Sequence, residues 1–326
     1  MPARHAMRLA VVLCGFACVH PAAAQSWPSR PLTMVVPFAA GGGTDVLGRI
    51  VGRRLSEVLG QPVIIENVGG AGGMVGSARV AKAPPDGYQF VLGSRADAIN
   101  QTPYKTPLYN FATDLAPVVL IADQPTILVA RKDLPGGNLR EFIAYARANQ
   151  ATMQMGSAGA GSTGHLDCML LNGAIGINVT HVPYRGGGPA IQDLIAGRID
   201  YFCTLSATAK PQIEASLIKA IAVLSRERSV MVPNLATAQE QGLDFEASTW
   251  FGFFLPPRTP APIVQKLNAA TVAAMETPSV QERLREVGAV VVAPERRSSE
   301  YLRTFVASEI AKNAAPIKAA GIVMGE

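Results

Sequence analysis

The chain has few of the side chains that build metal centres: four cysteines and four histidines among 326 residues. No Cys-x-x-Cys pair is present and no histidine stands at ligand spacing from a cysteine, so we expect no metal site. The sequence has no Gly-Lys-Ser/Thr P-loop, and Gly41-Gly42-Gly43 does not fit a G-x-G-x-x-G fingerprint. The segment Gly69 to Gly76 has similar spacing but lacks the acidic residue at the end of a following strand, so we expect no cofactor. Lysines and arginines form no cluster, and a net charge of +5 gives no case for nucleic-acid binding.

The N-terminus has the pattern of a secretory signal peptide. Two arginines precede the apolar stretch 9–19, and Ala22-Ala23-Ala24 supplies an Ala-x-Ala cleavage site. A membrane anchor is the alternative, but this stretch is too short to cross a bilayer of roughly 30 Å. A lipoprotein modified at Cys18 is a second alternative, which Phe16 disfavours. We predict removal of residues 1–24 and a periplasmic location.

Only Cys168 and Cys203 remain after this cleavage. An exported protein enters an oxidising compartment, where cysteines pair. We therefore predict a disulfide between these two residues.

Short β-branched runs alternate with amphipathic helical patterns along the mature chain, which predicts parallel βαβ units and an α/β fold. The expected strands cover residues 32–36, 63–66, 89–92, 115–121, 127–130, 152–155, 178–182, 199–202, 220–224 and 250–255. The expected helices cover residues 45–59, 75–81, 139–148, 165–174, 189–196, 261–275, 280–287 and 299–320.

Length and pattern together predict two domains. The alternation breaks at residues 100–114 and later resumes, so we place a discontinuous first domain at 25–123 and 250–326 and a second domain at 124–249. The final helix, 299–320, has no sheet of its own to cover, and we expect it to return to the first domain. Two linking segments make a hinge, and a hinge beside a cleft is typical of a binding protein that closes.

Two glycine-rich runs each follow an expected strand and open an expected helix. The first is Gly41-Gly42-Gly43-Thr44-Asp45, and the second is the segment 156–164. Glycines at a helix N-terminus leave backbone N–H groups accessible, and such a terminus attracts anions. We predict that the two runs face each other and clamp a carboxylate.

A third glycine-rich turn, residues 182–190, contains Tyr184 and Arg185. A planar side chain and a fixed positive charge suit a second carboxylate of the ligand. They suit a place on the rim of the cleft equally well, and the sequence leaves these two alternatives open.

Ser162 invites comparison with the serine of a G-x-S-x-G nucleophile elbow. The first position of the motif is Ala160 rather than Gly, however, and the glycine before the serine comes one place late, at Gly161. His165 and His181 are nearby in sequence, but no acid is positioned to orient either one. A secreted serine hydrolase is therefore a weaker alternative, and we expect no enzymatic activity.

The order and spacing of several motifs resemble the Bug/TctC family, the periplasmic solute-binding component of tripartite tricarboxylate transporters. The matching segments are Pro37 to Asp45, Glu66-Asn67 with Gly70 to Gly73, Pro85 to Tyr88, Gly156 to Leu166, Val182 to Gly186, Asp193 to Asp200, and Trp250 with Thr259-Pro260. The resemblance implies a two-domain type II periplasmic binding protein, a Venus flytrap with its ligand between the domains.

The resemblance also implies that backbone N–H groups and hydroxyls hold the carboxylate, mostly without an arginine. On this chain that role falls on Phe38, Gly42, Gly43, Thr44 and Asp45 in the first loop, and on Ser157, Gly161, Ser162 and Thr163 in the second. Ser94 is an expected cleft residue because it follows the strand that ends at residue 93. Arg95 and Asp167-Cys168 depart from the family pattern, which leaves the ligand's identity open.

The expected function is capture of a small organic acid and its delivery to the membrane permease of such a transporter, by a monomer. A ligand sensor that docks on a signalling receptor is an alternative that the sequence does not separate from transport.

Overall fold

A computed structural model describes residues 27–324 of the chain. The predicted signal peptide lies outside these residues. Between residues 27 and 324 no helix combines the length and the apolar character needed to cross a membrane.

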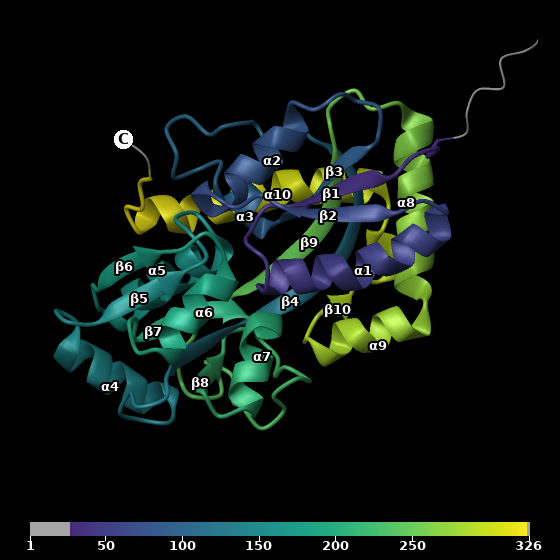
Figure 1. Cartoon of the computed structure of the whole chain (residues 1–326). Coiled ribbons are helices and arrows are strands. Elements are labelled where there is room, and N and C mark those ends of the chain that lie inside the picture. Colours follow the sequence, from purple (N-terminus) through teal and green to yellow (C-terminus); the bar gives the residue numbers. More distant parts are fainter. Residues whose placement is uncertain (1–26, 325–326) are drawn as a thin grey trace, which may run out of the picture.

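The protein forms two α/β lobes that meet along a long shared strand (Figure 1). The first lobe contains both ends of the described chain. Its strands are β1 (Leu32–Val36), β2 (Val63–Asn67), β3 (Gln89–Ser94), the first half of β4 (Ala116–Arg131), β9 (Ser248–Leu255) and β10 (Val290–Val291). Its helices are α1 (Gly43–Leu59), α2 (Met74–Ala81), α3 (Arg95–Ile99), α8 (Ala261–Glu276), α9 (Pro278–Glu286) and α10 (Ser299–Ala319).

The second lobe is formed by one continuous stretch of chain. Its strands are the second half of β4, β5 (Gln154–Ser157), β6 (Thr180–Pro183), β7 (Tyr201–Leu205) and β8 (Ile218–Val223). Its helices are α4 (Leu139–Asn149), α5 (Thr163–Ile175), α6 (Gly187–Ile195) and α7 (Ser206–Glu214).

The strands follow the order β2-β1-β3-β9-β4-β7-β5-β6, with β8 and β10 also paired to β4. The pairs of β1 with β2 and β3, and of β5 with β6 and β7, are parallel, as the βαβ pattern predicted. Strand β9 pairs antiparallel with both β3 and β4, which inserts a late segment of the chain into the first sheet. The predicted α/β fold is thus confirmed.

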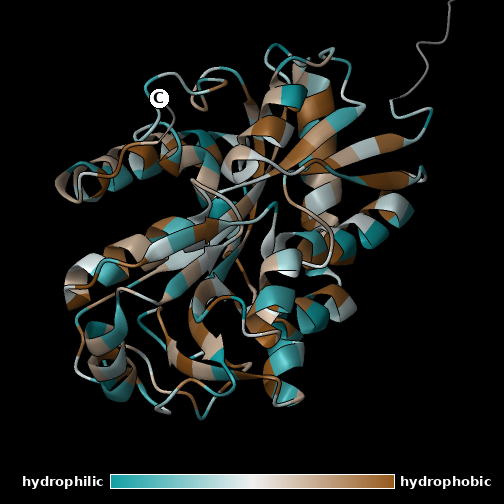
Figure 2. Ribbon diagram, turned by 60° about the vertical axis from the view of Figure 1, so that its left-hand side comes forward, coloured by the Kyte–Doolittle hydropathy of each residue, from teal (hydrophilic) through white to brown (hydrophobic). Residues whose placement is uncertain are grey.

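Helices cover both faces of the central strands, so β1, β3, β4 and β9 are largely apolar and buried on both sides, whereas the edge strands β2 and β6 are partly exposed (Figure 2). In β1, Met34 belongs to the core under α1 and α8, whereas its neighbour Val35 belongs to the core under α2 and α10. In β4, Leu128 and Val129 face opposite layers of the second lobe in the same way.

The predicted domain boundaries, 123/124 and 249/250, fall at positions that are neighbours in space. Asp123 of β4 pairs with Trp250 of β9, and Gln124 pairs with Thr249. Here β9 enters the first lobe beside the point at which β4 leaves it. These boundaries stay a prediction, and the paired strands are the natural place for a hinge.

Strand β4 differs from the sequence-based expectation of two strands, at 115–121 and 127–130. The structure has one strand of 16 residues, in which Pro125 still has a partner in β9. Register shifts near Val119 and Ala122 let the long strand bend without breaking its pairing.

Two helical features also differ from expectation. Helix α7 was not expected, because Pro211 lies inside it and proline normally argues against a helix interior. Helix α10 packs on β4 and α3 of the first lobe as predicted, but its far end also reaches the second lobe. There Ile317 shares an apolar cluster with Leu166 of α5.

Candidate functional site

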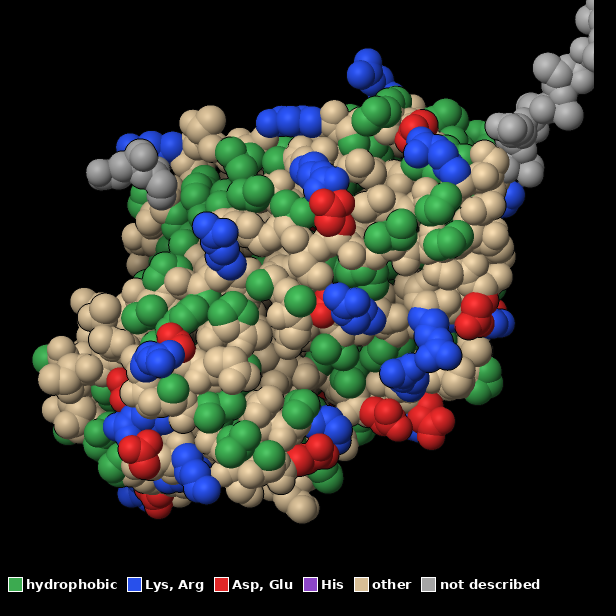
Figure 3. Space-filling model, in the orientation of Figure 1, with side chains coloured by type: hydrophobic (Ala, Val, Ile, Leu, Met, Phe, Trp, Pro, Cys, Tyr) green, Lys and Arg blue, Asp and Glu red, His purple; other side chains and the backbone are tan. Residues whose placement is uncertain are grey.

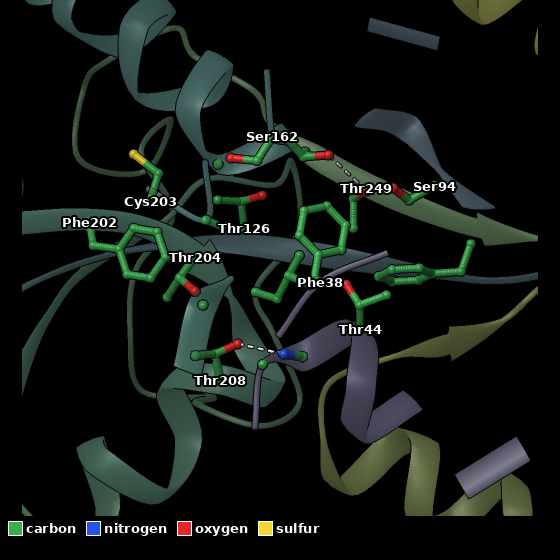
Figure 4. A pocket seen from close by; sticks show the side chains of 18 residues that line it. Phe38, Thr44, Ser94, Thr126, Ser162, Phe202, Cys203, Thr204, Thr208 and Thr249 are labelled. Atoms are coloured by element: carbon green, nitrogen blue, oxygen red, sulfur yellow. Dashed lines mark hydrogen bonds between the residues drawn. The ribbon is translucent and has the colours of Figure 1, made fainter. Parts of the chain in front are cut away.

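A pocket lies between the lobes, close to the crossing of β4 and β9 (Figure 4). Its volume is about 40 Å³, and one water centre needs roughly 10–15 Å³. The closed lobes therefore leave room for a small ligand. The lining residues are Phe38, Gly42, Gly43, Thr44, Ser94, Thr126, Ala158, Ser162, Thr163, Gly164, Gly187, Phe202, Cys203, Thr204, Leu205, Thr208, Thr249 and Phe251.

Four helices of nine residues or more begin at this pocket, and the short α3 begins beside it at Ser94. The first residues of α1 and α5 line it, and so do Gly187 at the start of α6 and Leu205 just before α7. The first four N–H groups of a helix have no partner within the helix, and each N-terminus carries about half a positive charge. None of the lining side chains carries a formal charge. The pocket is therefore electropositive through its backbone alone.

Hydroxyl groups supply the other polar contacts of the pocket. Thr208 Oγ1 accepts a hydrogen bond from Gly43 N–H at 2.7 Å, which leaves its own proton to donate to another acceptor. Thr163 and Thr249 approach each other at 3.5 Å from opposite lobes (Figure 4). Hydroxyls and backbone N–H groups together are the donors that a carboxylate needs.

The rest of the wall is apolar. Phe38 and Phe251 come from the first lobe, and Phe202 and Leu205 come from the second. Figure 4 places Phe38 in the middle of the site, between the hydroxyl groups of the two lobes. A ligand with a carboxylate and a short hydrocarbon body matches this combination.

Seven of the predicted ligand residues line the pocket: Phe38, Gly42, Gly43, Thr44, Ser94, Ser162 and Thr163. Ser94 and Ser162 also cap helices, because their Oγ atoms accept hydrogen bonds from Ala96 N–H and His165 N–H. The buried Asp97 accepts from Ser94 N–H at 2.8 Å and so holds Ser94 at the pocket.

Two predicted ligand residues, Asp45 of the first glycine-rich run and Ser157 of the second, do not line the pocket. The carboxylate of Asp45 turns away from the pocket and accepts hydrogen bonds from Gly41 N–H, Arg49 and Asn67. Burial alone would raise the pKa of Asp45, but these bonds outweigh it and the pKa lies below its usual value. Ser157 is the last residue of β5 rather than a loop residue, and its Oγ lies 2.6 Å from Nε2 of His181.

Three further predicted residues also lie outside it. At Gly161 an added Cβ would meet the Asn100 side chain. Tyr184 donates its hydroxyl proton to Asp193 at 2.7 Å. The side chain of Arg185 is exposed, and only its carbonyl oxygen reaches the first lobe. Neither Tyr184 nor Arg185 lines the pocket, and the choice between ligand and rim stays a prediction.

Sequence reasoning missed the side chains that strands β4, β7 and β9 and helix α7 bring to the pocket. The missed residues with hydroxyl groups are Thr126, Thr204, Thr208 and Thr249. A threonine in or after a buried strand is too common to stand out, and only the pairing of distant strands brings these four together. Gly187 could have been found, because it lies in the third glycine run beside the residues that were chosen.

The unusual residues Arg95 and Asp167 contact each other across the lobes. Arg95 Nη1 lies 2.7 Å from Asp167 Oδ1, and Thr126 donates to the other carboxylate oxygen at 2.8 Å. Burial raises the pKa of Asp167, and the Arg95 guanidinium opposes that shift. Because Thr126 lines the pocket, this ion pair stands directly behind the wall of the site.

His165 and His181 stack at 4.0 Å behind the second glycine run. Burial lowers the pKa of His165 to about 3 and that of His181 to about 4, so both rings are neutral at pH 7. Nδ1 of His165 accepts from Gly161 N–H at 3.2 Å. The Ser162 hydroxyl accepts a hydrogen bond from the backbone N–H of His165, which is the geometry of a helix cap.

A disulfide joins Cys168 of α5 to Cys203 of β7, with Cα atoms 5.5 Å apart. Cys203 also lines the pocket. The bond fixes α5, whose first residues face the ligand space, to the central strand of the second lobe.

Two lobes that close over an uncharged pocket of helix N-termini define a solute-binding protein of the two-domain Venus flytrap class. A family model described as tripartite tricarboxylate transporter family receptor (TctC) matches residues 47–322. The chain belongs to this family, as its motifs had indicated.

Individual relatives agree with this assignment. A protein of Agrobacterium vitis, named UPF0065 protein in the TAR-I ttuE-ttuC' intergenic region, is 40% identical over 300 residues, which are 92% of this chain and 87% of the relative. The structure of periplasmic binding protein BugD is similar with a TM-score of 0.88 at 36% identity, covering 91% of this chain and 99% of that chain. MatC from Rhodopseudomonas palustris, with bound malate, has a TM-score of 0.85 at 38% identity, covering 89% of this chain and 100% of that chain.

Proposed function

We propose that this protein captures a small organic acid between its lobes in the periplasm and delivers it to the membrane permease of a tripartite tricarboxylate transporter. The observation that carries the proposal is the meeting of four helix N-termini at one pocket without any charged side chain. Each terminus favours an anion by about 0.3–2 kcal/mol, depending on burial. The malate in the MatC structure shows that a similar protein binds a carboxylate.

The ligand's carboxylate would lie between Gly42–Thr44 of the first lobe and Ser162–Gly164 of the second. Each hydrogen bond to a charged group contributes about 1.5–3 kcal/mol. Closure of the lobes excludes water and strengthens these bonds. The apolar wall around Phe38 would receive the hydrocarbon part of the ligand.

A thermal-shift screen tests the proposal. The compounds are malate, succinate, adipate, benzoate and pyruvate, with glucose and spermidine as neutral and cationic controls. We expect one or more of the acids to raise the melting temperature and the controls to leave it unchanged. Stabilisation by the controls alone would contradict the proposal.

Two variants then place the carboxylate. Ser162→Ala and Thr44→Val each remove one hydroxyl of the lining, and either loss should weaken binding roughly ten- to a hundredfold. Ser308→Ala and Thr304→Val are the matched controls, because both residues lie exposed on α10. If all four variants bound the ligand as tightly as the wild type, the carboxylate would not bind in this pocket.

A hydrolase using Ser162 remains the alternative from another class. The capping contact between Ser162 and His165 N–H supports binding rather than nucleophilic attack. Ester turnover by the wild type that disappears in Ser162→Ala would decide for the hydrolase.

A further inference from the structure

A further contact between the lobes lies outside the pocket lining and is made by backbone atoms. Ala39 N–H of the first lobe donates to the carbonyl oxygen of Arg185 in the second at 3.0 Å. Glycines flank this hydrogen bond on both sides. We call Gly69 and Gly72 of the first lobe, with Gly186 and Gly188 of the second, the glycine seam.

Each glycine of the seam faces backbone atoms of the opposite lobe at a distance that leaves no room for a side chain. A Cβ at Gly69 would lie 2.5 Å from the Arg185 oxygen, and one at Gly188 would lie 2.5 Å from the Ala40 oxygen. A Cβ at Gly186 would lie 2.8 Å from Ala39 N, and one at Gly72 would collide with the Ala160 oxygen.

Real Cβ atoms essentially never come within 3.0 Å of another heavy atom, and a backbone atom cannot rotate away as a side chain can. The lobes reach their observed separation only because these four positions lack side chains. None of the four lines the pocket.

We propose that the glycine seam holds the lobes together without ligand and thereby sets the protein's affinity for its ligand, which the seam does not touch. This inference rests on the proposed function for its consequence, the effect on ligand affinity, whereas closure of the lobes is tested separately, without ligand. When only part of the population is closed, the apparent dissociation constant rises in inverse proportion to that part.

Gly69 and Gly188 are suited to substitution, because neither has a left-handed φ. Alanine therefore causes no backbone strain there. At Gly188 all three of the nearest atoms belong to the opposite lobe, so the collision disappears when the lobes separate. The substitution should act on the closed state and leave the folding of each lobe intact.

The experiment compares Gly69→Ala and Gly188→Ala with the wild type and with Gly137→Ala. Gly137 is the matched control, because a Cβ there has no neighbour within 4 Å. Circular dichroism and thermal unfolding first establish that each variant folds. The two test positions lie in different lobes, so misfolding of one variant leaves the other to decide.

Hydrogen exchange of the segment 39–44 and small-angle X-ray scattering then report closure without any ligand. We expect a protected segment in the wild type and in Gly137→Ala, and faster exchange with a larger radius of gyration in both seam variants. Titration with malate should show a dissociation constant about tenfold higher in a variant whose closed fraction falls to roughly a tenth.

Unprotected amides in the wild type, or seam variants with wild-type exchange and scattering, would overturn the proposal. If the seam variants open but no acid binds the wild type, the result would support the glycine seam and contradict the proposed function. The two ideas therefore fail separately.

Discussion

Arg95 of α3 and Asp167 of α5 form an ion pair of 2.7 Å that joins the two lobes beside the pocket. Only 1% of the Asp167 side chain and 14% of the Arg95 side chain are exposed. On the first lobe's side, Arg95 also donates to Asn313 of α10 and to the carbonyl oxygen of Ser248. The pair thus connects four separate parts of the chain: α3, α5, α10 and β9.

Arg95→Gln should destabilise the protein by about 3 kcal/mol, because it leaves the buried carboxylate of Asp167 without its cation. Urea unfolding at pH 7 measures this loss. Arg30→Gln is the control, since the Arg30–Asp86 pair is exposed on both sides and should contribute less than about 1 kcal/mol. Equal losses in the free energy of unfolding would show that the buried pair stabilises the fold no more than the exposed pair does.

The stacked histidines predict that stability falls in mild acid. The pKa values of His165 and His181 in the folded protein are about 3 and about 4, below the ordinary 6.5. Between about pH 4 and 6.5 the unfolded chain binds more protons than the folded one, so the free energy of unfolding falls as the pH falls. Each histidine contributes at most about 1.4 kcal/mol per pH unit.

Urea unfolding between pH 7.5 and 5.5 checks this dependence. His181→Gln should make the slope against pH shallower, because one of the two titrating rings is gone. An unchanged slope would mean that His181 does not titrate differently in the folded and unfolded states.

The Cys168–Cys203 disulfide should stabilise the second lobe and shape the pocket. It closes a loop with a sequence separation of 35 residues, for which the chain-entropy model gives about 3–4 kcal/mol. The double variant Cys168→Ser/Cys203→Ser should therefore melt at a lower temperature and bind its acid more weakly. Wild-type protein treated with a reductant should behave like the variant, and an unchanged melting temperature would contradict the prediction.

Arg185→Gln should leave acid binding nearly unchanged, within about twofold, because the side chain is exposed and outside the lining. The hydrogen bond between Arg185 and the first lobe is made by its backbone, which the substitution keeps. Calorimetric titration with a mono- and a dicarboxylate checks this outcome. A large loss for the dicarboxylate alone would place Arg185 on the ligand's far carboxylate.

The sequence predicted those parts of the site that one short segment encodes. Gly42, Gly43 and Thr44 follow a strand and begin a helix, so their accessible N–H groups can be inferred from neighbours in the chain. Thr204 and Thr249 could not be inferred, because they reach the pocket only through the pairing of β4 with β7 and β9.

Other residues were predicted for the right place but the wrong role. The three glycines of the third run, Gly186 to Gly188, were assigned to a turn. In the structure all three lie against or beside the opposite lobe. Ser157 was expected in a loop because of its glycine neighbours. Strand β5 instead continues through Gly156, where Ile199 fills the space a side chain would need.

A charged residue in a glycine-rich turn was also a poor guide to ligand contact. Arg185 stands in a glycine-rich turn near the ligand space, yet its guanidinium points to solvent. Charged side chains of both signs are scattered over the face shown in Figure 3, without a broad patch of one sign. The direction in which a side chain leaves a turn depends on backbone geometry that composition does not contain.

The position of β9 between β3 and β4 has a consequence for the order in which the chain folds. A chain that is synthesised from its N-terminus presents β4 to β8 together, so the second lobe can assemble before the remainder is available. The first three strands can also pair with one another early, but their sheet joins β4 only through β9, near the end of the chain. The sheet of the first lobe is thus completed only by one of the last segments of the chain, and until β9 arrives the edge of β3 lacks its partner.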